Sequence, residues 1–193
     1  MERIKKFRFP VPALGCLFSF LLWGICIQPA CSPKPQEVII KVGQTTITEQ
    51  DVLQKIAVEK VYGNLLDRCD AIVMIVNQSI ELEVSRAIGI CPAQQEVVQF
   101  KDHAIQTTKA PELLKKIFHI YEKDEKGLNA FFFAPKIANS KLAAYYNSTV
   151  SNKENIGFDK WLIILAKDIL IDIRRTECAD EIALKFPAVW WNK

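Results

Sequence analysis

Residues 71–100 read AIVMIVNQSIELEVSRAIGICPAQQEVVQF, and this stretch decides the fold. Apolar residues recur in it at spacings of three and four, which predicts one face of a long α-helix. That face consists of Val73, Val76, Ile80, Val84 and Ala87. Further apolar residues widen the face, so we expect neighbours to contact this helix from several directions. Gly89 stops the helix, and Pro92 predicts the first turn of a second one, with Glu96 near its positive end.

Length and composition favour one folded domain. The chain has 193 residues, of which 50% are hydrophobic, and this is enough for a sizeable core. The net charge of +3 comes from residues 1–30, which hold four basic residues and one acidic residue. The remaining chain has 21 of each kind, so its balanced charge does not indicate a nucleic-acid partner.

The six cysteines form no C-x-x-C pair, and His103 and His119 are the only histidines. A metal or redox site therefore has little support, and we predict no metal and no cofactor. Cys69, Cys91 and Cys178 lie beyond the leader and suit small, partly buried positions. Two of them could form a disulfide in an exported protein, but the sequence does not choose the pair.

The first 30 residues have the pattern of a signal peptide. A basic start precedes 15 mostly apolar residues, 13–27, which is short for a membrane span. Ala30-Cys31 then resembles the end of a bacterial lipoprotein signal, although Gln28 stands where an aliphatic residue is usual. We predict lipidation at Cys31, a proline-rich tether over 31–36 and a periplasmic, membrane-anchored protein. A plainly cleaved signal and an uncleaved anchor remain alternatives.

Two short β-branched segments, 37–42 and 169–173, are the convincing strand candidates. Apart from a small return at 45–47, neither has a hairpin partner beside it, and an unpaired strand leaves backbone groups without hydrogen bonds. We therefore expect the two segments to pair, which places residues 158–175 in the core. The rest reads as helices, so we predict a mostly α domain over 37–175. A small two- or three-stranded sheet joins its N- and C-terminal segments, and 176–193 is a C-terminal tail.

No pattern of catalytic residues stands out. The chain lacks a G-x-S-x-G sequence, a phosphate-binding glycine loop and an H-E-x-x-H sequence. We therefore predict that the protein is not an enzyme.

Groups of consecutive aromatic residues are more informative. Three phenylalanines occupy 131–133 and two tyrosines occupy 145–146, and neighbouring residues of a helix point in different directions. Each group is either mostly core or part of a partly exposed apolar groove. On the second interpretation the peptide-binding residues are Phe131, Phe132, Phe133, Tyr145 and Tyr146.

Four segments in order resemble the N-terminal domain of SurA-type and PrsA-type chaperones. The first is VIIKVGQTTITEQDV at 38–52, a strand followed by V-x-G-x-x-I-T and an acidic helix start. The hydrophobic helix and turn of 72–97 resemble the next segment of that family. FFAPKIANSKLAAYY at 132–146 and WLIILAKDILIDI at 161–173 resemble its later helix and its closing helix and strand.

The resemblance implies a SurA N-like helical module that binds unfolded or partly folded exported proteins in a helical groove without ATP. A parvulin isomerase domain often interrupts that family before its closing segment. Only residues 148–155 occupy this place here, without the parvulin histidines or G-G-D-L-G, so isomerase activity is not implied. The alternative function is a structural or assembly lipoprotein that binds one dedicated protein partner.

Overall fold

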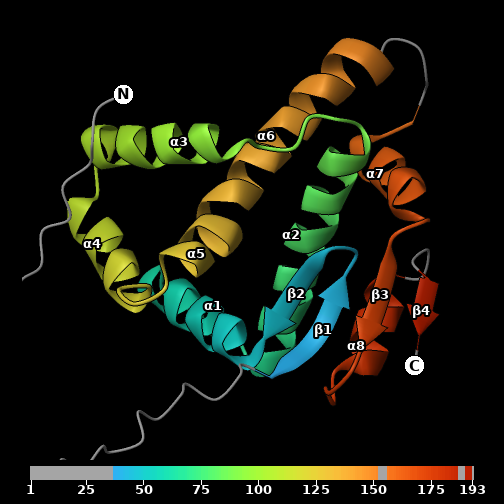
Figure 1. Ribbon diagram of the computed structural model, residues 1–193, viewed down its shortest axis with the longest axis horizontal. Helices are drawn as coiled ribbons and strands as arrows, with labels where there is room; N and C mark the ends of the chain where they lie inside the picture. Colours follow the sequence, from blue (N-terminus) through green and yellow to red (C-terminus); the bar gives the residue numbers. More distant parts are fainter. Residues whose placement is uncertain (1–36, 152–155, 187–189, 193) are drawn as a thin grey trace, which may run out of the picture. The chain divides into compact units, whose positions relative to one another are not determined.

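Strands from both ends of the domain form one sheet (Figure 1). β1 (Val38–Val42) pairs antiparallel with β2 (Thr45–Thr48) on one side and with β3 (Leu170–Ile173) on the other. The short strand β4 (Trp190–Asn192) lies parallel to β3, which gives the order β2-β1-β3-β4. The predicted pairing of the two ends is confirmed, as is a mostly helical fold around a small sheet.

The computed structural model describes residues 37–151, 156–186 and 190–192, which lie in the compact unit Pro35–Lys193. The predicted signal peptide, the tether over 31–36 and Cys31 lie outside the described residues. The helices are α1 (Glu49–Val61), α2 (Arg68–Ala87), α3 (Gln94–Thr107), α4 (Pro111–Ile120), α5 (Glu125–Gly127), η1 (Leu128–Phe133), α6 (Ala134–Tyr145), η2 (Tyr146–Val150), α7 (Phe158–Ala166) and α8 (Ala179–Lys185). The segments η1, α6 and η2 follow one another without a break, and η1 and η2 have the wider π-helical turn.

Helix α2 is central, as its periodicity predicts. It packs against α1, α6, α7, α8 and the β1–β2 hairpin, and Figure 1 shows it behind the sheet. The Asp67 carboxylate caps its start by accepting a hydrogen bond from the backbone N–H of Asp70 at 2.8 Å. Gly89 follows its end with a φ of 75°, which is the left-handed conformation expected of a helix stop.

The prediction for the next helix is wrong at one position. Helix α3 begins at Gln94, with Ala93 as its N-cap, so Pro92 lies before the helix and not in its first turn. The Glu96 carboxylate accepts a hydrogen bond from the backbone N–H of Ala93 at 2.7 Å, and this contact fixes the start of α3. Glu96 does lie near the positive end of the helix, as predicted.

Apolar side chains form two separate clusters. The main core joins the sheet, α2, α7 and α8, and includes Ile40, Ile72, Trp161, Ile171, Cys178 and Ile182. The second core joins α1, α3, α4, η1 and α6, and includes Val58, Val97, Ile117, Phe132, Phe133 and Ile137. Cys178 and Ile182 belong to the segment that the sequence presents as a tail, so part of that segment is packed into the domain.

A buried capping box holds the junction between β2 and α1. The Asp51 carboxylate accepts hydrogen bonds from the backbone N–H and the hydroxyl of Thr48, at 2.7 and 2.6 Å, and the Thr48 hydroxyl accepts one from the backbone N–H of Asp51. Burial raises the pKa of Asp51, and the hydrogen bonds from Thr48 oppose this effect.

We expect Asp51→Ala to lower the free energy of unfolding by about 1–2 kcal/mol, because the cap is lost. Gln50 precedes it and is exposed, so Gln50→Ala is the matched control and should change stability by less than about 0.5 kcal/mol. Urea denaturation followed by circular dichroism measures both. Equal losses in the two variants would contradict a specific role for the cap.

Candidate functional site

The structure places the three predicted phenylalanine contacts in two different cores. Phe132 and Phe133 are only 7% and 1% exposed, and their rings meet edge to face at 4.9 Å in the second core. Phe131 is half-buried against the main core. Consecutive side chains of η1 therefore link the two clusters. The burial of Phe132 and Phe133 favours the core interpretation of this group.

The two predicted tyrosine contacts hold α7 against the end of the long helix. Tyr145 stacks on Trp161 with 6.1 Å between ring centroids, and Tyr146 meets Phe158 edge to face at 5.5 Å. The Tyr146 hydroxyl also donates a hydrogen bond to the carbonyl of Ile156. Both tyrosines are half-buried in this contact, which is separate from that of Phe132 and Phe133.

A groove of about 550 Å³ lies between the end of α2 and the elements of the second core, and we call it the seam groove. Its apolar wall contains Leu82 of α2, Val97 and Val98 of α3, Ala130 of η1 and Ala134 of α6. Leu82 is 6% exposed and belongs to neither core, so its side chain serves as part of the groove wall. The polar and remaining lining residues are Thr45, Arg86, Cys91, Pro92, Gln94, Glu125, Lys126 and Asn129.

Val98 is the residue of this groove that sequence reasoning missed. Val97 and Val98 are adjacent on a helix, about 100° apart, so a core that buries one leaves the other near the surface. Val97 is 4% exposed and Val98 is 38% exposed, as this geometry requires. The sequence signal for an exposed apolar residue here was a pair of neighbouring valines on a helix. The groups of consecutive aromatic residues are a signal of the same kind.

Most charges around the seam groove are paired. Arg86 forms an ion pair with Glu83, and Glu125 accepts a hydrogen bond from the Lys101 ammonium at 2.7 Å. Lys101 thereby holds the pKa of Glu125 below its usual value. Glu83 also accepts hydrogen bonds from the backbone N–H groups of residues 44 and 45, so it fixes the hairpin turn over α2. Paired charges around an apolar wall suit an occupant that is mainly apolar.

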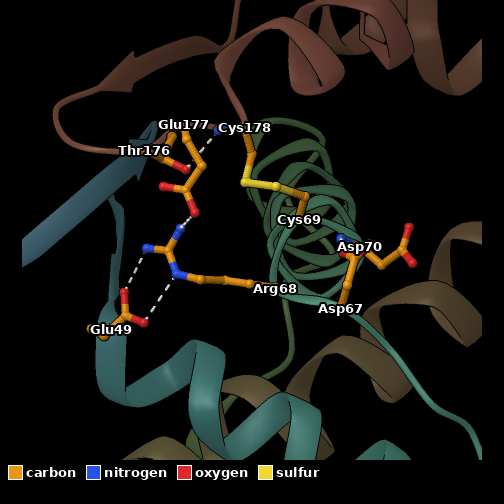
Figure 2. Close-up of a disulfide and its surroundings, with 8 residues drawn as sticks. All are labelled: Glu49, Asp67, Arg68, Cys69, Asp70, Thr176, Glu177 and Cys178. Atoms are coloured by element: carbon orange, nitrogen blue, oxygen red, sulfur yellow. Dashed lines mark hydrogen bonds and ion pairs between the residues drawn. A yellow bond between two sulfur atoms is a disulfide. The ribbon is translucent and has the colours of Figure 1, made fainter.

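A disulfide joins the start of α2 to the segment before α8. Cys69 and Cys178 are bonded across a sequence separation of 109, and Cys91 is a free thiol on the wall of the seam groove. Figure 2 shows the guanidinium of the neighbouring Arg68 between the carboxylates of Glu49 and Glu177. It donates hydrogen bonds to Glu49 at 3.1 and 2.7 Å and to Glu177 at 2.6 Å. The hydrogen bonds from Arg68 to Glu49 hold the pKa of Glu49 below its usual value.

Residues with metal-binding side chains come together at one point in the described part of the chain. Cys69, Cys178 and Glu181 offer ligand atoms within 4.8 Å of one another. The two sulfur atoms are bonded to each other, so in this oxidised form neither is a thiolate ligand. His103 and His119 are both exposed, and His119 contacts Glu122 at 3.2 Å.

Among residues 37–151, 156–186 and 190–192, no helix combines the length and the apolar character needed to cross a membrane. Comparison of the chain with protein-family models, with curated proteins and with solved structures found no match.

Proposed function

We propose that the protein is an exported, ATP-independent, chaperone-like module that binds short apolar segments of unfolded proteins. The observation that carries the proposal is the seam groove. It is open, it has an apolar wall, and its volume of about 550 Å³ lies in the range of about 300–1,000 Å³ that is common for binding pockets. The exposed apolar residue of the groove is Val98, so the binding residue of the proposal is Val98 in place of the buried Phe132 and Phe133.

Two other features support this proposal. The helical fold with β1 and β3 side by side agrees with the fold that the resemblance to SurA-type chaperones implies. The disulfide between Cys69 and Cys178 is typical of proteins that fold in an oxidising compartment, as an exported chaperone does. Lipidation at Cys31 and membrane anchoring are part of the same proposal.

We expect Val98→Glu to weaken binding of an unfolded protein at least about tenfold. Burying a valine side chain contributes about 1.5–3 kcal/mol, and about 1.4 kcal/mol corresponds to a factor of ten in Kd. Fluorescence anisotropy with labelled, reduced and carboxymethylated α-lactalbumin measures the change. Ile105→Glu is the matched control, because Ile105 is also an exposed apolar residue of α3, at 49%, but does not line the groove.

Thermal unfolding of both variants separates a binding defect from a folding defect, and Val98→Ala provides a milder change at the same position. Equal binding by the Val98 and Ile105 variants would refute the seam groove as the site.

Suppression of aggregation should extend to several unrelated unfolded proteins. Capture of a single protein species, without such general activity, would favour the alternative of one dedicated partner.

A further inference from the structure

The two cysteines of the disulfide differ in their exposure to solvent. Cys178 is fully buried in the main core, at 0% exposure. Cys69 is half-buried and lines an open hollow of about 420 Å³ between α2 and α8. We call this the disulfide hollow, and its other lining residues are Asp67, Asp70, Val73, Glu181, Leu184 and Lys185.

We propose that Cys69 is a site of thiol–disulfide exchange with external thiols. The thiolate of the external molecule attacks Sγ of Cys69 and forms a new sulfur–sulfur bond, while the bond between Cys69 and Cys178 breaks. The electron pair of the broken bond leaves with Sγ of Cys178, which then takes a proton from water. One disulfide is exchanged for another, so the step needs no separate oxidant or reductant.

Access decides which sulfur is attacked. Cys69 lines the open disulfide hollow, so a thiolate from solvent can reach this residue. Cys178 lacks such an approach in the folded protein, because it is buried among main-core residues. Attack at Cys178 therefore requires the domain to open first.

The charges of the disulfide hollow select the class of thiol. Three carboxylates, those of Asp67, Asp70 and Glu181, line it with one ammonium group, that of Lys185. A carboxylate oxygen of Glu181 lies within 4.8 Å of both sulfur atoms. The net negative field repels anionic molecules and attracts cationic ones. The preferred partner is therefore a thiol that carries a positive charge beside its sulfur.

Exchange at Cys69 would convert a covalent link into a non-covalent contact. The disulfide ties the start of α2 to the residue before α8, and after exchange α8 is held through contacts such as those of Ile182, which is fully buried. The mixed disulfide on Cys69 would thus mark a form of the protein in which α8 is less firmly attached.

The test treats the full-length oxidised protein with three thiols: cysteamine, which is cationic, 2-mercaptoethanol, which is uncharged, and 2-mercaptoethanesulfonate, which is anionic. Samples are quenched with acid, alkylated and digested with trypsin, which separates Cys69 in peptide 69–86 from Cys178 in peptide 176–185. We expect the peptide with Cys69 to carry the added thiol as a mixed disulfide and the peptide with Cys178 to carry the alkyl group. The rate of each thiol with the protein is divided by the rate of the same thiol with bis(2-hydroxyethyl) disulfide.

After this normalisation, cysteamine should react about fivefold faster than the anionic thiol, and 1 M salt should remove most of the difference. Glu181→Gln should reduce the ratio, whereas Asp180→Asn should not, since Asp180 lies on the same helical turn but outside the hollow. Modification of Cys178 in place of Cys69, or one limiting rate shared by all three thiols, would overturn the proposal. The second result would mean that exchange waits for unfolding.

Discussion

Truncation of the chain after Asn155 is expected to abolish the cooperative unfolding transition of the remaining domain. The deletion removes α7, β3 and α8, and with them five buried members of the main core: Trp161, Ala166, Ile171, Cys178 and Ile182. Loss of one large buried side chain costs about 2–5 kcal/mol, and total stabilities are about 5–15 kcal/mol. The combined loss therefore exceeds the stability that a domain of this size has.

The same deletion also opens the sheet. β1 would lose β3 as its partner along the register from Ile40–Ile173 to Val42–Ile171. The central strand β1 would then become an edge strand of a two-stranded sheet. We therefore expect the truncated protein to associate or aggregate as well as to unfold without cooperativity. Circular dichroism during thermal denaturation and size-exclusion chromatography measure the two effects.

Truncation after Phe186 is the matched control. It removes β4 but keeps α7, β3, α8 and the disulfide, so a cooperative transition should remain. If the chain that ends at Asn155 stays monomeric and unfolds cooperatively with little loss of stability, the role assigned to the pairing of β1 and β3 is wrong.

Local patterns account for the parts of the fold that were predicted correctly. The spacing of apolar residues in α2 reports directly which face is buried, because a helix repeats every 3.6 residues. Helix α1 begins at Glu49, within the segment 38–52 that the sequence gives an acidic helix start, and Thr48 and Asp51 cap it through contacts three residues apart. The pairing of β1 with β3 followed from a requirement of the backbone, since each strand candidate lacked a local partner.

Tertiary contacts decided the features that the sequence left open. The segment 179–185 is short and contains several charged residues. Its helix, α8, is held to the domain by the burial of Ile182 and by the bond of Cys178 to Cys69. Neither contact has a signal near it in the sequence. The aromatic groups had two interpretations for the same reason, because only the positions of α3 and α4 decide that Phe133 is enclosed.

Replacement of both bonded cysteines, Cys69→Ala with Cys178→Ala, is expected to lower the free energy of unfolding by about 4–5 kcal/mol. A cross-link that closes a loop of about 100 residues stabilises a protein by about 4.7 kcal/mol in the chain-entropy treatment, because it restricts the unfolded chain. The bond between Cys69 and Cys178 spans 109 residues. Denaturation by urea, with and without dithiothreitol, measures the change.

Cys91→Ala is the matched control, because Cys91 is a free thiol and closes no loop. The free energy of unfolding of Cys91→Ala should stay close to that of the unchanged protein. Dithiothreitol should destabilise Cys91→Ala and the unchanged protein to the same extent. The double variant should not respond to dithiothreitol, which separates the effect of the cross-link from any effect of the smaller side chains in the main core. If reduction leaves the unchanged protein as stable as before, the disulfide does not hold the two ends of the domain together. The non-covalent contacts of β3, α7 and α8 must then be sufficient for its stability.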